Sequence, residues 1–152
     1  MADFMATCAS NHPKLKDHAA IEQIISRYFF DPDFNVGVCF DENTGKPYLF
    51  LYAYQWPEAW KMPAGISPED FDPYTQDQYE DGAQEFIGFL LEIAPYLLEP
   101  LIVQAVGNVR CHFPLSACEW YAAPDATEVQ LNEFRHGHSE SISLPNSLSE
   151  AS

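Results

Sequence analysis

The chain has 152 residues, of which 23 are acidic and 7 are basic, so its formal charge at pH 7 is -16. Its hydrophobic content of 47%, with 14% aromatic residues, excludes an acidic disordered tail and suffices for one folded domain. A field of this sign repels nucleic acid and anionic membranes and attracts basic proteins.

The first ten residues have neither a basic region nor a long apolar core, so they do not resemble a secretory signal. No apolar run reaches the roughly 20 residues that span a bilayer. Without a signal peptide, the four cysteines, Cys8, Cys39, Cys111 and Cys118, indicate reduced thiols rather than disulfides. These features predict a cytoplasmic protein.

A helix is predicted from about Asn11 to Asp31, because apolar side chains recur there at the 3.6-residue period. Alternation then takes over from Val36 to Phe40, and the polar segment 41–46 supplies a turn before a second alternating run. This pattern predicts a β-hairpin.

One face of the second hairpin strand is entirely aromatic, and its members are Tyr48, Phe50, Tyr52, Tyr54 and Trp56. Five such side chains present roughly 1,000 Å², more than the apolar patch of about 300–600 Å² that a soluble monomer exposes. Something therefore covers part of this face. Either the helices of the chain pack on it as core or its phenol groups reach solvent, or else a partner or second copy of the chain binds near Tyr54, Trp56 and Trp60.

Four prolines make the segment 57–80 irregular, and a second helix is predicted after Asp81, with an apolar stripe that ends before Pro95. Two or three short strands follow, the first two joined by a Gly107-Asn108 turn, and an edge strand is expected near residues 127–134. The whole predicts an α+β two-layer sandwich, with an antiparallel sheet of about four to six strands and two main helices on one face. We expect one domain over residues 11–138 and a Ser-rich mobile tail over 139–152.

The acidic segment does not match a metal site, because Thr75 stands where an EF-hand loop from Asp70 requires glycine, and Pro73 disturbs the loop. Cys111, His112 and Cys118 lack the spacing of zinc ligands. The glycine-rich, nucleophile-elbow and zinc-protease motifs are absent from the sequence. We therefore assign no catalytic residue, no metal and no cofactor.

Acidic residues concentrate between Glu58 and Glu99, where ten acids accompany one base, Lys61. Carboxylates select a basic partner by charge, while aromatic side chains supply the buried area of an interface. The predicted function is a non-enzymatic acidic interaction protein that binds a basic protein surface as an inhibitor, immunity-type protein or adaptor. The predicted binding residues are Trp56, Trp60, Glu69, Asp70, Phe71, Asp72, Tyr74, Asp77, Tyr79, Glu80 and Asp81.

Two alternatives remain open. A small intracellular enzyme could use Cys118 with His112, or one of His136 and His138 with a carboxylate. An acidic surface could also serve only solubility or adaptation to salt. The uneven distribution of charge favours a binding site over uniform adaptation.

Overall fold

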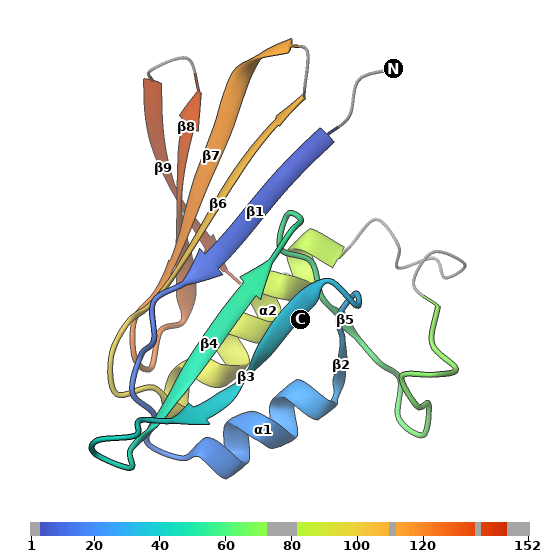
Figure 1. Cartoon of the computed structure of the whole chain (residues 1–152), viewed down its shortest axis with the longest axis vertical. Coiled ribbons are helices and arrows are strands. Elements are labelled where there is room, and N and C mark those ends of the chain that lie inside the picture. Colours follow the sequence, from blue (N-terminus) through green and yellow to red (C-terminus); the bar gives the residue numbers. More distant parts are fainter. Residues whose placement is uncertain (1–3, 73–81, 110–111, 136–137, 146–152) are drawn as a thin grey trace.

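A computed structural model of the chain describes residues 4–72, 82–109, 112–135 and 138–145. Within these residues lie a seven-stranded sheet, a two-stranded sheet and two α-helices (Figure 1). The elements are β1 (Phe4–Ser10), α1 (His18–Ser26), β2 (Tyr28–Phe29), β3 (Phe34–Phe40), β4 (Pro47–Ala53), β5 (Trp60–Lys61), α2 (Gly82–Ile93), the short 3-10 helix η3 (Ala94–Tyr96), β6 (Leu101–Val109), β7 (His112–Ala122), β8 (Glu128–Arg135) and β9 (His138–Pro145).

The large sheet has the strand order β3-β4-β1-β6-β7-β8-β9, and every neighbouring pair in it is antiparallel. The small sheet pairs β2 with β5. Together with the two helices, this arrangement confirms a mixed α+β protein built on an antiparallel sheet. The strand β3 forms one edge of the large sheet, a position that matters for the binding site described below.

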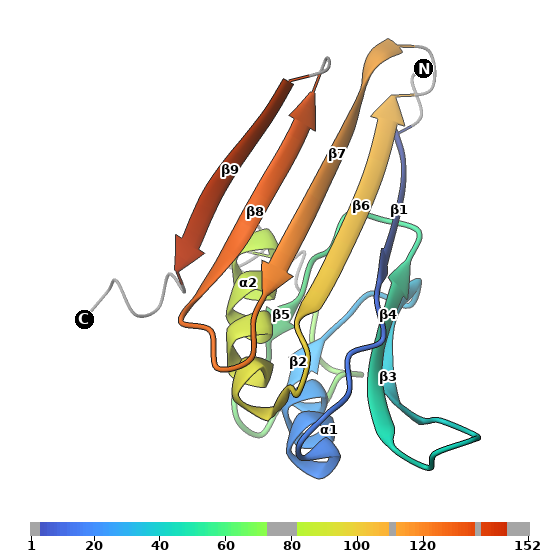
Figure 2. The ribbon, with the colours of Figure 1, turned by 90° about the vertical axis from the view of Figure 1, so that its left-hand side faces the viewer.

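The core forms where one face of the sheet meets the apolar sides of the helices. Cys8 lies opposite Ala53 on β4 and opposite Ala105 on β6, so all three side chains point to the same face. That face and both helices belong to one buried cluster, and Figure 2 shows α1 and α2 on the same side of the sheet. The helices contribute Ile21, Ile24, Phe86, Phe89, Leu90 and Ile93.

The face of β4 that packs in the core is not the aromatic one. Leu49, Leu51 and Ala53 are buried, whereas Tyr52 is 42% exposed. The interpretation that helices cover the aromatic face was therefore wrong, whereas the alternative that its tyrosines reach solvent agrees with the exposure of Tyr52 and Tyr54. Leucine and alanine fill the space beneath the helices without a polar atom, while a tyrosine buried there would need a partner for its hydroxyl.

The helix α1 begins later than the sequence pattern indicated. Asp17 caps it by accepting a hydrogen bond from the Ala20 amide at 3.1 Å. Asn11, expected at the helix start, instead joins the chain to β6, because its side chain accepts from the Ile102 amide and donates to the Pro100 carbonyl, both at 2.9 Å. The helix ends at Ser26, since the following residues pair with β5.

The predicted Gly107-Asn108 turn lies inside β6, which continues to Val109. The register with β7 shifts between Gly107 and Val109, and Pro114 lies in the β7 stretch opposite that shift. A proline offers no amide donor to a sheet, so it is found at such irregularities. Four strands were not anticipated: β1, the short β2 and β5, and β9, which takes up residues 138–145 although we expected a tail from residue 139.

Candidate binding site

The acidic segment 67–72 is held in place by one buried aromatic ring. Phe71 is 6% exposed, and its ring centroid lies 5.4 Å from that of Phe29 on β2. Beside it, the Asp70 amide donates to the Ser67 carbonyl at 3.0 Å, and the Ser67 hydroxyl donates to the Asp70 carboxylate at 3.0 Å. The carboxylates of Glu69, Asp70 and Asp72 are exposed. The segment therefore displays its charge from a fixed backbone.

Other predicted binding residues are placed differently from our expectation. Trp60 is fully buried, and Phe71 serves as an internal anchor, so neither ring is available to a partner. Trp56 is partly buried, with its ring 6.4 Å from that of Trp120. The Trp60 indole occupies the space that Gly82 leaves open, since a Cβ atom at Gly82 would lie 2.6 Å from its Cζ2. Tyr74, Asp77, Tyr79, Glu80 and Asp81 lie outside the described residues.

An aromatic groove runs beside the edge strand β3 and reaches the acidic segment. Its volume is about 390 Å³, within the range of about 300–1,000 Å³ typical of ligand sites. We call it the edge groove; its lining is Ile25, Ser26, Tyr28, Phe29, Phe30, Phe34, Asn35, Val36, Phe50 and Pro68. Pro68 lines the groove and also belongs to the acidic segment 67–72. The groove therefore opens next to the exposed carboxylates of Glu69 and Asp70.

A second apolar area lies on the face of the sheet opposite the core. Tyr54 is 63% exposed, Tyr52 is 42% exposed, and their rings meet edge to face at 5.3 Å. Val106 on β6 extends the area and is 41% exposed. These three side chains border a shallow hollow of about 260 Å³, whose floor is formed by β1. The tyrosine pair is the part of the predicted aromatic surface that remains accessible.

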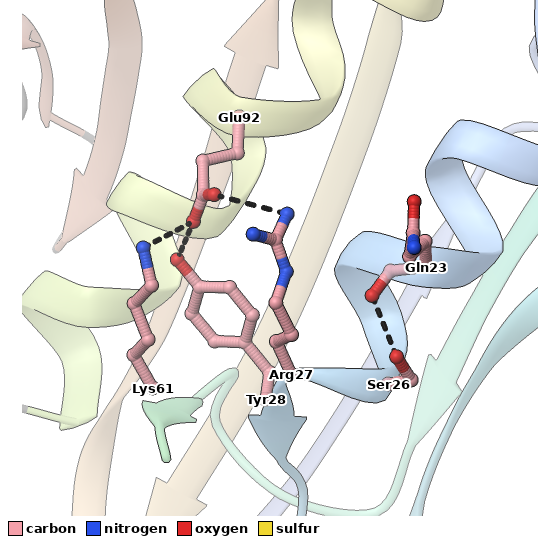
Figure 3. Close-up of polar contacts among 6 residues, drawn as sticks. All are labelled: Gln23, Ser26, Arg27, Tyr28, Lys61 and Glu92. Atoms are coloured by element: carbon pink, nitrogen blue, oxygen red, sulfur yellow. Dashed lines mark hydrogen bonds and ion pairs between the residues drawn. The ribbon is translucent and has the colours of Figure 1, made fainter. Parts of the chain in front are cut away.

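Basic side chains are engaged elsewhere in the fold. Glu92 on α2 lies 3.8 Å from the Arg27 guanidinium and 3.5 Å from the Lys61 ammonium, and it accepts a hydrogen bond from the Tyr28 hydroxyl (Figure 3). Lys16 pairs with Asp125 at 3.5 Å. Part of the acidic clustering is therefore structural.

Two further acids of the same region also have internal roles. Glu85 accepts a hydrogen bond from the Lys61 amide at 3.1 Å, and Glu99 accepts one from the Lys14 amide at 2.9 Å. Burial raises the pKa of Glu58, and the neighbouring negative charge of Asp31 raises it further. The exposed acids Glu69, Asp70 and Asp72 all lie in the segment 67–72.

Tyr28 provides a pH-dependent prediction. Burial raises the pKa of its phenol above the ordinary value of 10.0, and the hydrogen bond to Glu92 raises it further. As pH rises above 10, the unfolded chain loses this proton while the folded chain keeps it, so the free energy of unfolding falls. We expect Tyr28→Phe to show a shallower loss of stability above pH 10 than the unmodified protein, measured from urea midpoints between about pH 8 and pH 11. Parallel curves would contradict this assignment.

The enzymatic alternative concerns the cysteines and histidines of the chain. Burial raises the pKa of the Cys8 thiol to about 12, which makes it a poor nucleophile. His12 and Cys39 share an open hollow of about 610 Å³, but no hydrogen bond described for this part of the chain joins them. Cys111 and His136 lie outside the described residues, as do the side chains of His112 and His138.

The described residues contain neither a membrane-spanning helix nor a cluster of metal ligands. Neither α1 nor α2 combines the length and apolar character that a membrane crossing requires. Within the same residues, no three His, Cys, Asp or Glu side chains gather closely enough to hold a metal ion. Comparison of the chain with protein-family models, with curated proteins and with solved structures finds no match.

Proposed function

We propose that the protein is a non-enzymatic, cytoplasmic binding protein that recognises a basic surface on another protein, as an inhibitor, immunity-type protein or adaptor. Its scaffold would be the two-layer sandwich inferred from the sequence, with an acidic recognition segment at one sheet edge. The observation that carries the proposal is the display of Glu69 and Asp70 from a segment anchored by buried Phe71 beside the edge groove.

Charge and apolar area act together in such a site. Carboxylates at the rim accelerate encounter with a basic partner and disfavour acidic ones, because their field extends about 10 Å at 0.1 M salt. Apolar pockets then hold the side chains that supply most of the binding energy. The segment 67–72 and the edge groove place these two elements next to each other.

Charge reversal tests the proposal. The variant Glu69→Lys/Asp70→Lys is expected to lower the association rate constant with a partner isolated by affinity capture by about tenfold at low salt, because rim charges act mainly on the encounter. The matched control is Glu42→Lys/Glu128→Lys, which makes the same change in net charge at exposed positions on other parts of the surface. Stopped-flow association measured from low to high salt provides the readout.

The outcomes separate recognition from salt adaptation. If the segment recognises the partner, the association rate constant of the unmodified protein falls as salt rises. In the Glu69→Lys/Asp70→Lys variant the same rate constant depends less on salt. If both variants associate at the same rate, the segment is not the recognition site. A protein that folds only at high salt, with association independent of salt, would instead support adaptation of the surface.

A further inference from the structure

We infer that the edge groove binds an extended basic segment of the partner, which pairs with β3 as an additional strand of the sheet. This inference rests on the proposed function and specifies how the partner is held. It combines three observations: the position of β3, the groove beside it and the charge next to that groove.

Among the described residues, β3 pairs with another strand on one side only, and on this strand the Phe34 amide already donates to the Asp31 carbonyl at 2.8 Å. It is the terminal strand in the sheet order, and its seven residues include no charged residue and no proline. Edge strands usually carry such residues to prevent pairing with another chain. Alternate residues of an edge strand direct their amide and carbonyl groups outward, so an extended peptide can continue the antiparallel ladder.

The groove supplies positions for the side chains of that peptide. Asn35 and Val36 of β3 form one wall, and Ile25 of α1 and Phe29 of β2 form the other. The Phe50 ring lies over Gly37, since a Cβ atom at Gly37 would be 3.0 Å from the ring, and this position lets it reach the groove. A peptide paired with β3 would therefore direct every second side chain towards an apolar surface.

Charge selects the occupant. Pro68 lines the groove and is followed in the chain by the exposed Glu69 and Asp70, so lysine or arginine on the incoming segment is attracted there. A second copy of this chain could also pair through β3, but it carries the same charge of -16 and the same exposed acids. Repulsion disfavours that dimer, and the complementary occupant is a basic segment.

The test uses a synthetic peptide of alternating lysine and valine, about eight residues long, to match the length of β3. At a peptide concentration of about ten times Kd, amide hydrogen exchange at alternate positions of residues 34–40 is expected to slow by about tenfold. A peptide of alternating glutamate and valine is the charge control and is expected not to bind. The Glu69→Lys/Asp70→Lys variant should bind the lysine peptide about tenfold more weakly than the Glu42→Lys/Glu128→Lys control.

Two N-methylated forms of the lysine peptide test pairing directly, each modified at one of the two alternating sets of amides. Only one set points towards β3, so one form is expected to lose binding and the other to keep it. Equal binding of both forms, absence of binding by the parent peptide, or a free protein already dimerised through β3 would each overturn the inference. Charge-dependent binding of the captured partner without protection of β3 would overturn strand pairing and leave the proposed function intact.

Discussion

Phe89→Ala is expected to lower the free energy of unfolding by about 3 to 5 kcal/mol, as large-to-small changes at fully buried aromatic positions do. Phe89 has no exposed surface, and its ring lies 5.2 Å from that of Tyr28 and 5.3 Å from that of Phe30, both edge to face. Its removal therefore opens a cavity where α2 meets the strands. Urea denaturation followed by tryptophan fluorescence measures the change.

Phe50→Ala is the matched control on the sheet. If the aromatic face of β4 were core, Phe50→Ala would cause a similar loss, but the structure leaves this ring partly exposed. We therefore expect a clearly smaller loss than for Phe89→Ala, because less apolar area returns to water. Equal losses would mean that the aromatic face is covered in solution.

The most predictable parts of the fold were those with a strong local period. The stripe formed by Phe86, Phe89, Leu90 and Ile93 is fully buried, and the β3-β4 hairpin occurs around the expected polar turn. The helix that carries the stripe and the hairpin both depend on contacts between residues that are near in sequence. Periodicity could show that β4 has two unlike faces, but it could not show which face the helices would cover.

The missed strands lacked a local signal. The sequence of β1 is composed largely of small residues, and its role becomes clear only from its position between β4 and β6. Likewise, β9 consists mainly of polar residues and owes its strand conformation to pairing with β8.

The candidate site was only partly predictable for the same reason. Clustered carboxylates are visible in the sequence, so Glu69 and Asp70 could be selected. The edge groove was not visible, because it brings Ile25, Phe50 and Pro68 together from distant parts of the chain. Nor could the sequence show that Glu92 would be used to hold Arg27 and Lys61.

Gly82→Ala is expected to destabilise the protein by about 1 to 3 kcal/mol, although alanine is the better helix former. A Cβ atom at Gly82 would lie 2.6 Å from Cζ2 and 2.7 Å from Cε2 of Trp60, and 3.0 Å from the Glu58 carboxylate. Trp60 is fully buried, so its rigid ring cannot move aside as an exposed side chain would. Ala83→Leu, at the neighbouring exposed helix position, is the control and should change stability by less than about 0.5 kcal/mol.

A double-mutant cycle with Trp60→Phe tests whether the indole is the cause. The smaller ring lacks the fused six-membered part that carries Cζ2, so it leaves room for the new methyl group. Trp60→Phe alone should be destabilising, but adding Gly82→Ala to it should cost at least about 0.5 kcal/mol less than adding the same change to the unmodified protein. Strict additivity of the two losses in urea denaturation would show that Gly82 is required for another reason, such as the backbone at the start of α2. A positive coupling energy between the two substitutions would show that the Trp60 indole packs against Gly82. This contact would then hold α2 against β5 and against the segment that leads from β5 to the edge groove.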